Sequence, residues 1–170
     1  GHTGYVSKRD DAFIVAVTDH QGTNALRVVS TVGRLLPAFA SATGRSLLAR
    51  MSDDQVRALY PNGLPPAPSA KAPQNLDDLL VRLAAIRRAG YATSYDEASR
   101  GVAAIAVAVG DRLTGEEVAL CIVFPLTTSD TAEQATITKA LREGASKIAA
   151  MGDDRKFVLP AEHGSKGRPL

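Results

Sequence analysis

The chain has 170 residues, of which 45% are hydrophobic and 22% charged, and its formal net charge at pH 7 is +2. This composition is typical of a globular domain that is long enough to bury a core. The small net charge argues against a nucleic-acid-binding surface spread over the domain, and no apolar run reaches the roughly 18 residues of a membrane span. A single cysteine excludes an internal disulfide framework and favours a reducing cytoplasm.

The amino end, GHTGYVSKRDD, is polar from its first residue, so we expect no signal peptide. Gly1 and His2 resemble a cloning remnant, which favours a fragment of a longer protein. Residues 12–18, AFIVAVT, are apolar and β-branched and predict a buried strand. After the turn DHQGTN, residues 25–30 predict the strand that returns beside it, and residues 31–40 predict a loop because Gly33 and Pro37 interrupt them.

Three helices are predicted in the middle of the chain. The first runs from Ala42 to about Arg50, and Ser52 caps the second. The segment 61–74 holds five prolines and predicts a solvent-exposed loop. Asn75 caps the third helix, whose leucines repeat at helical spacing until Gly90 ends it.

In the next segment, small residues alternate with branched residues. Residues 91–95, YATSY, predict a short edge strand, and a longer strand follows in which Ala104, Ala106 and Ala108 alternate with Ile105, Val107 and Val109. Residues 118–125, VALCIVFP, predict its antiparallel partner, on which Ala119, Cys121 and Val123 form a comparably small face. Short side chains on adjoining strands leave space. This favours a ligand cavity over the alternative, a close-packed alanine-rich helix.

Ser129 is predicted to cap a last helix, from Asp130 to about Met151. Its expected buried side consists of Ala132, Ala135, Ile137, Ala140, Leu141, Ala145 and Ile148. The tail beyond it is predicted to be loose apart from a contact through Phe157, Val158 and Leu159. Two antiparallel strand groups separated by helices indicate an α+β fold.

Catalytic and metal-binding patterns are weak. The histidines, His2, His20 and His163, lack ligand spacing and are interpreted as solvated surface residues. Cys121 has no basic sequence neighbour to lower its pKa, so structural burial is favoured. Asp96 and Glu97 are adjacent and predict a solvated turn, since neighbouring side chains of an extended segment point apart. The helix start ATGRS, residues 42–46, offers backbone N–H groups to an anion, although packing is the preferred interpretation. We therefore predict that the chain is not an enzyme.

Three segments together resemble the C-terminal effector-binding domain of IclR-family bacterial transcription regulators. They are VGRLLPAFASATGRSLLA (32–49), SDDQVRAL (52–59) with IRRAGYATSYDE (86–97), and GYATSYDEASRGVAAIAVAVGD (90–111). The last is similar to the family signature in the spacing of Gly90, Ser94, Glu97 and Ala104. It departs at Gly110, where the family usually has an aromatic residue or histidine. The resemblance delimits an effector-binding domain at residues 3–151 and a C-terminal tail at 152–170.

The resemblance implies a GAF-like fold, in which a six-stranded antiparallel sheet has helices packed on both sides and a small-molecule pocket on one face. It also implies a winged helix-turn-helix domain that precedes this chain and alone contacts DNA. A cytoplasmic homodimer or tetramer is expected, with a small-molecule effector, no cofactor, no metal and no membrane association. The pocket positions that carry over are Ala104, Cys121 and Val123, then Ala25, Val28, Ala42 and Thr43, with Ser94 at the lip.

Departures from the family suggest the chemistry of the effector. Members that sense small carboxylic acids often carry Asp, Cys and two Ser at four positions that here hold Ser94, Ala104, Cys121 and Val123. A buried carboxylate without partners costs several kcal/mol, so we predict an apolar or aromatic metabolite rather than glyoxylate or pyruvate. Two other functions stay open: a small GAF-like enzyme that uses Cys121 or Ser94, and an oligomerisation module whose own side chains fill the pocket.

Overall fold

The computed structural model describes residues 1–26, 28, 32–110, 115–127 and 129–153. Six strands form one antiparallel sheet in the order β3-β2-β1-β6-β5-β4. The strands are β1 (Thr3–Asp10), β2 (Phe13–His20), β3 (Leu35–Pro37), β4 (Ala92–Tyr95), β5 (Val102–Gly110) and β6 (Glu117–Pro125). The helices are the 3-10 turn η1 (Ala38–Ala40), α1 (Ala42–Leu48), α2 (Asp53–Leu59), α3 (Leu76–Ala89) and α4 (Thr131–Asp153).

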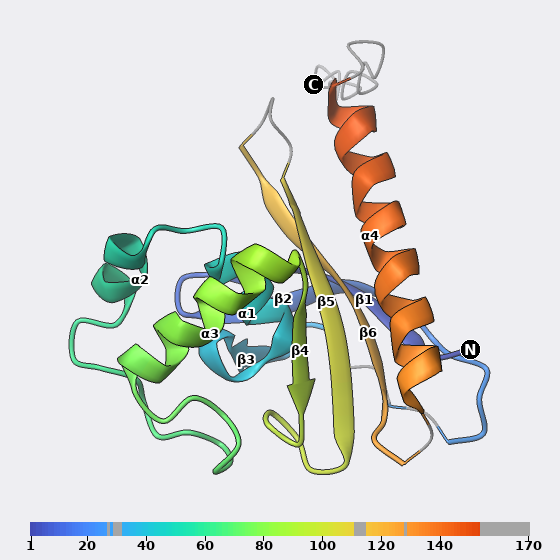
Figure 1. The fold of residues 1–170 in the computed structure, drawn as a ribbon, viewed down its shortest axis with the longest axis horizontal. Helices are drawn as coiled ribbons and strands as arrows, with labels where there is room; N and C mark the ends of the chain where they lie inside the picture. The colour runs from blue at the N-terminus through green and yellow to red at the C-terminus, as the bar shows by residue number, and fades with distance from the viewer. Residues whose placement is uncertain (27, 29–31, 111–114, 128, 154–170) are drawn as a thin grey trace, which may run out of the picture.

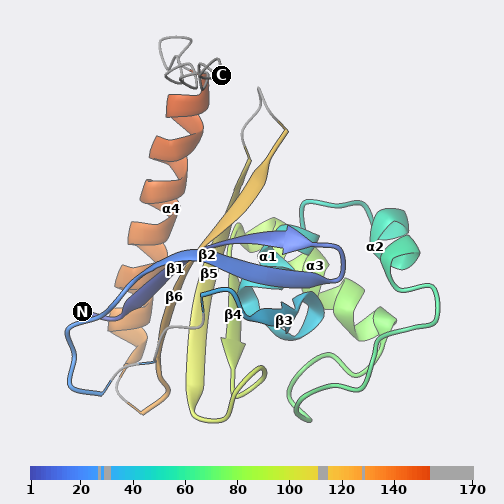
Figure 2. The same cartoon turned by 180° about the vertical axis from the view of Figure 1, so that it is seen from behind.

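The helices lie on both sides of the sheet, so the α+β, GAF-like architecture is confirmed. Figure 1 and the reverse view in Figure 2 show α4 along one side, with α1 and α3 on the other and α2 farthest from α4. The β5–β6 hairpin is the longest antiparallel pair, and the close spacing of its strands in sequence predicted it correctly.

The amino-terminal segment forms the centre of the sheet, because β1 pairs with both β2 and β6. Its buried side chains, Thr3, Tyr5 and Ser7, alternate along the strand. Two of the three are polar, so hydropathy alone gave no sign of a strand here.

The returning strand expected at residues 25–30 is wrong for the part that can be judged. Ala25 and Leu26 lie in a bend, whereas 27, 29 and 30 fall outside the described residues. The partners of β2 are β1 and the short β3, which lies within the predicted loop. Pro37 is compatible with β3 because that strand is at the edge of the sheet, where a missing N–H leaves no ladder bond unmade.

The predicted helix ends on the α1 side are confirmed. The Ser52 side chain forms a capping box with Gln55, and Asn75 Oδ1 accepts a hydrogen bond from the Asp78 N–H at 2.9 Å. Gly90 ends α3 with φ +77°. Gly44 in α1 is required by close packing, since a Cβ there would collide with the backbone of Ala38. Every residue of α1 is buried.

The prediction for α4 is correct in extent but wrong in detail. Its cap is Asp130, whose Oδ1 accepts from the Glu133 N–H at 2.8 Å, and not Ser129. Leu141 and Ala145 are buried and Ile137 is half-buried, as expected. The other predicted core positions are exposed: Ala132, Ala135, Ala140 and Ile148. Alanine favours a helix on any face, so it is a poor marker of the buried stripe. The suggested contact through 157–159 lies outside the described residues.

The small-residue face and the large-residue face predicted for the β5–β6 hairpin are confirmed. Ala104 lies opposite Val123, Ala106 opposite Cys121, and Ala108 opposite Ala119, so the small residues share one face. The intervening large residues share the other face with Leu141 and Ala145 of α4; they are Ile105, Val107, Val109 and Phe124.

Candidate ligand-binding site

A cavity of about 110 Å³ lies on the small-residue face, between the sheet and the amino end of α1. Its walls are mainly apolar and consist of Tyr5, Ile14, Ala16, Val28, Leu36, Ala42, Ala98, Val102, Ala104, Cys121 and Val123. Its polar lining consists of Ser7, Arg34, Ser41, Thr43, Ser94 and Ser99. An apolar hollow with a few polar groups is the usual composition of a small-molecule site.

The small face of β5 is covered along part of its length and hollow along the rest. Ala106 is fully buried and clusters with Ala42 of α1, and Ala108 packs against the cluster that contains Leu47 and Leu48. The hollow lies at the Ala104 end. The close-packed helix and the cavity, which the sequence left as alternatives, therefore occupy different parts of one face.

The predicted pocket positions converge from distant parts of the chain. Those that line the cavity are Val28, Ala42, Thr43, Ser94, Ala104, Cys121 and Val123. Ala25 does not line it and is exposed. That these side chains contact a ligand stays a prediction.

Four polar lining residues were missed by sequence reasoning: Ser7, Arg34, Ser41 and Ser99. Ser7 lies on β1, which was not recognised as a strand in the sequence, and Arg34 immediately precedes β3, which was assigned to a loop. Ser41 caps α1 and accepts from the Gly44 N–H at 3.0 Å. The alternation of buried residues in β1 would have placed Ser7 on the cavity side. Arg34 makes no ion pair with any of the described residues, and its side chain is exposed.

The thiol of Cys121 is buried in the wall of the cavity. Burial raises its pKa to about 11, and a hydrogen bond with the Thr43 side chain opposes this rise only in part. The group is therefore a neutral thiol near pH 7, whereas the thiolate is the nucleophile. The geometry supports the structural interpretation of Cys121.

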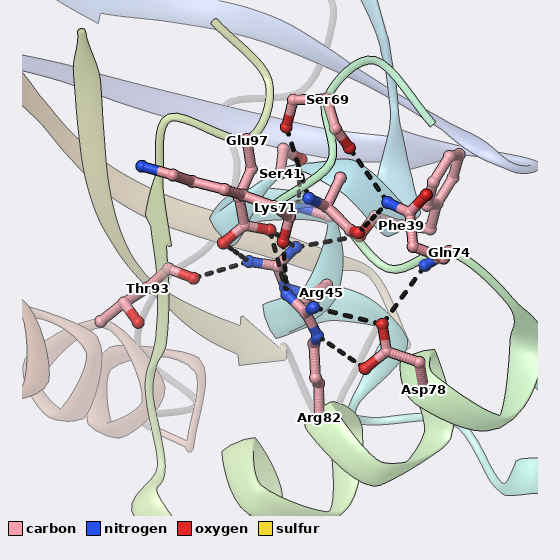
Figure 3. Close-up of polar contacts among 12 residues, drawn as sticks. Phe39, Ser41, Arg45, Ser69, Lys71, Gln74, Asp78, Arg82, Thr93 and Glu97 are labelled. Carbon is pink, nitrogen blue, oxygen red and sulfur yellow. Dashed lines mark hydrogen bonds and ion pairs between the residues drawn. The ribbon is translucent and has the colours of Figure 1, made fainter. Parts of the chain in front are cut away.

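A buried ion pair lies beside the cavity (Figure 3). Arg45 of α1 binds Glu97 through two hydrogen bonds of 2.6 and 3.0 Å, and the two side chains are 2% and 8% exposed. Arg45 also donates to the carbonyl oxygens of Phe39 at 3.0 Å and Thr93 at 2.6 Å. Burial lowers the pKa of Arg45 while Glu97 opposes this, and the guanidinium stays charged. Bidentate pairing of this kind fixes geometry as well as charge.

The network extends to α3 and the proline-rich loop. Arg82 donates to Asp78 at 3.0 Å and to Glu97 at 3.5 Å, and Lys71 pairs with Asp96 at 2.6 Å. The solvated turn predicted for Asp96 and Glu97 is therefore wrong for Glu97, which is 7% exposed. Its partner Arg45 is 52 residues away in sequence, so no local pattern indicated the pairing.

His2 packs against the fold, so the solvated interpretation is wrong for this residue. Its ring centroid lies 5.3 Å from that of Phe124, and its Nε2 is 2.8 Å from Glu133 Oε1. The solvated interpretation holds for His20, which is exposed, and His163 lies outside the described residues. Within the described ranges, no group of three or more His, Cys, Asp or Glu side chains is placed to hold a metal ion, and none of the helices has the length and apolarity needed to cross a bilayer.

A larger groove of about 620 Å³ lies on the opposite face, between α4 and β4. It is shallow, and it includes Tyr91, Tyr95 and Arg142 but none of the predicted pocket positions. The cavity beside Ala104, which most of the predicted positions line, is therefore the better candidate for a ligand site.

Residues 1–150 match the family described as bacterial transcriptional regulator IclR C-terminal. The HTH-type transcriptional regulator XynR of Escherichia coli (strain K12) is 27% identical over 152 residues, which cover 89% of this chain and 59% of XynR. The HTH-type transcriptional regulator KdgR of the same strain is 27% identical over 148 residues, covering 87% of this chain and 56% of KdgR. The chain thus spans little more than half the length of these relatives.

Crystal structures share the fold. The C-terminal domain of E. coli KdgR has a TM-score of 0.77 at 25% identity, covering 88% of this chain and 87% of that domain. A double mutant of the PobR inducer-binding domain from Acinetobacter, in complex with 3-hydroxybenzoic acid, has a TM-score of 0.78 at 23% identity and covers 87% of each chain.

Proposed function

This chain belongs to the IclR C-terminal family of bacterial transcriptional regulators, and on that premise we propose that it senses a small organic effector in the cavity beside Ala104, Cys121 and Val123. Effector binding changes DNA binding by a winged helix-turn-helix domain that precedes the chain, within a homodimer or tetramer. Such an effector acts by stabilising one of two conformations, to the extent that its affinities for them differ. The observation that carries the proposal is the convergence of short side chains from several elements on one cavity.

The proposed effector is fairly apolar or aromatic. The cavity walls are mainly alkyl groups, and Thr43 and Ser94 supply hydroxyls. Burial of roughly 200 Å² of apolar surface contributes about 5 kcal/mol, which is of the same order as the cost of association. The net affinity must therefore come from hydrogen bonds to the polar groups of the lining. The complex of the PobR domain with 3-hydroxybenzoic acid supports the capacity of this fold for an aromatic ring.

Arg34 gives the cavity one cationic group, so an apolar ligand that ends in an acid group suits it best. Glyoxylate has the acid group but lacks the apolar body, and we expect it not to bind. Replacement of Arg34 by Met is expected to weaken 3-hydroxybenzoate about tenfold, or about 1.4 kcal/mol. The affinity for a neutral aromatic alcohol should not change.

Thermal unfolding with a ligand panel tests the proposal. A ligand at 100 times its Kd adds about 2.7 kcal/mol, which raises the Tm of a chain of this size by roughly 5–10 °C. We expect this rise with 3-hydroxybenzoate or octanoate and none with glyoxylate. Ala104→Leu, which fills the cavity, should abolish the rise, whereas Ala132→Leu on the exposed side of α4 should keep it. A rise with glyoxylate alone would refute the ligand class, and a rise that survives Ala104→Leu would refute the site.

The two alternative functions have less support. Homologues of this chain are named transcriptional regulators, and the raised pKa of Cys121 disfavours nucleophilic catalysis. Mass spectrometry of each ligand after incubation with the protein should show it chemically unchanged. An oligomerisation module with a filled pocket disagrees with the hollow beside Ala104.

A further inference from the structure

The cavity is too small for a ligand of the proposed class. Its volume of about 110 Å³ is smaller than the roughly 150 Å³ of a cavity known to hold benzene. An aromatic ligand therefore enters only when a wall moves. The strands are held by backbone ladders and α1 is buried along its whole length. Outside these elements the cavity is lined by Val28 and Arg34 and by the connection between β4 and β5, and a buried ion pair holds this connection to α1.

This connection has a residue with positive φ at each end, and we call these two residues its hinges. Asp96 has φ +58° and Gly101 has φ +74°, both in the left-handed region, which is uncommon for a residue other than glycine. Asp96 Oδ1 accepts from the Gly101 N–H at 2.6 Å, so the two hinges are tied to each other. Between them, Ala98 and Ser99 form part of the cavity wall.

One side chain between the hinges reaches the protein interior. Glu97 binds Arg45 through both carboxylate oxygens and lies 3.5 Å from Arg82. Arg45 is independently anchored by the carbonyl oxygens of Phe39 and Thr93 (Figure 3). The guanidinium is thus a fixed point, and Glu97 is the group that can leave it. Neither residue lines the cavity.

We propose that the Arg45–Glu97 ion pair is the latch of the cavity. It holds residues 97–100 against the hollow, and the cavity becomes accessible when the pair separates while the sheet stays folded. Arg45 and Glu97 are positioning residues, since neither lines the cavity. The inference rests on the proposed function only in treating the cavity as a ligand site, because the opening is a property of the chain without ligand.

Cys121 allows the opening to be measured directly. It is the only cysteine in the chain, and its thiol lies in the cavity wall. Iodoacetamide is small and neutral, and its reaction with Cys121 in folded protein should be slow because the thiol is buried and its pKa is raised. The alkylation rate, followed by mass spectrometry and divided by the rate in unfolded protein, gives the fraction of time that Cys121 is accessible. The dependence of this fraction on urea, below the concentration that unfolds the chain, distinguishes two routes of access. A local opening gives a slope near zero, whereas global unfolding gives the full m-value of unfolding.

Glu97→Gln removes the charge at nearly constant size, and we expect it to accelerate alkylation about tenfold or more with a urea slope near zero. Glu97→Asp, which keeps the charge but shortens its reach, should lie between Glu97→Gln and the unmodified chain. The matched control is Glu117→Gln, which breaks the pair of Glu117 with Arg50 away from the cavity and should change the rate less than about twofold.

If Glu97→Gln folds poorly, Lys71→Met provides the same test from the exposed side, since it frees the hinge residue Asp96. It should accelerate alkylation severalfold without loss of global stability. Unchanged rates in these variants would overturn the proposal, as would acceleration that matches the loss of global stability and carries the full urea slope. No ligand is present in this experiment, so a failure of effector binding and a failure of the latch remain distinguishable.

Discussion

The two faces of the β5–β6 hairpin are built from alternate residues of the same strands, yet one is filled and the other is partly hollow. On the α4 face, Ile105, Val107 and Phe124 pack against Leu141 and other apolar residues. On the α1 face, alanines leave about 110 Å³ beside Ala104. Since each strand residue faces one side only, the choice of side chain at every second position sets the two layers independently.

The comparison also extends to charge. The α1 side holds the buried pair of Arg45 and Glu97, with Arg82 beside it, whereas the cluster between α4 and the sheet is apolar. A buried ion pair is weak evidence for stability and is often retained for geometry. The α4 face is therefore held by apolar contacts, whereas the α1 face combines a larger apolar cluster with a shaped space and the charged groups beside it.

The largest expected effect tests the filled face. Phe124 is fully buried and its ring lies beside His2, so Phe124→Ala should lower the free energy of unfolding by about 3–5 kcal/mol. Ile148→Ala on α4 is the control, since Ile148 is 41% exposed and its truncation should cost about 1 kcal/mol or less. Urea denaturation measures both. A cost for Phe124→Ala as small as that for Ile148→Ala would show that this face is not closely packed.

The next effect tests the hollow face through pH. The pKa of Cys121 is raised from 9.0 to about 11 in the folded chain, so the folded state holds its proton more tightly than the unfolded state. The resulting stability is complete below pH 9 and is lost as the pH rises toward 11. The loss has an upper limit of roughly 2–3 kcal/mol, since one pKa unit corresponds to about 1.4 kcal/mol.

Cys121→Ala removes this titration but leaves all other groups in place. The free energy of unfolding, measured in urea from pH 8 to pH 11, should therefore fall more steeply for the unmodified chain than for Cys121→Ala. If the two curves of unfolding free energy against pH are parallel, water already solvates the Cys121 thiol in the folded state.

Local patterns predicted the elements whose signals are local. Ser52 and Asn75 cap their helices, Gly90 ends α3, and the alternation around Ala104 placed the small residues on one face. The sequence-based prediction failed where polar residues are buried. Thr3 and Ser7 are buried in the central strand β1, so its polar composition concealed it.

The candidate site divides in the same way. Ala104, Cys121 and Val123 were foreseen because strand parity and the family resemblance agree on them. The pairing of Arg45 with Glu97 and the position of Arg34 depend on how distant segments come together. The size of a side chain can be read from the sequence, whereas the ion-pair partner of a charged residue depends on the tertiary structure.

The smallest expected effect distinguishes the hollow part of the α1 face from its covered part, only two residues away. Ala106 is fully buried against Ala42, so Ala106→Leu forces extra atoms into a packed layer and should cost about 1–3 kcal/mol. Ala104→Leu places the same atoms in the cavity, and its free energy of unfolding should stay within about 0.5 kcal/mol of the original or rise. The two variants have the same change in composition and the same strand face, which removes β-propensity and transfer free energy from the comparison. Equal costs in urea denaturation would mean that the layer is close-packed at both positions, and a ligand site beside Ala104 would then lack the space it requires.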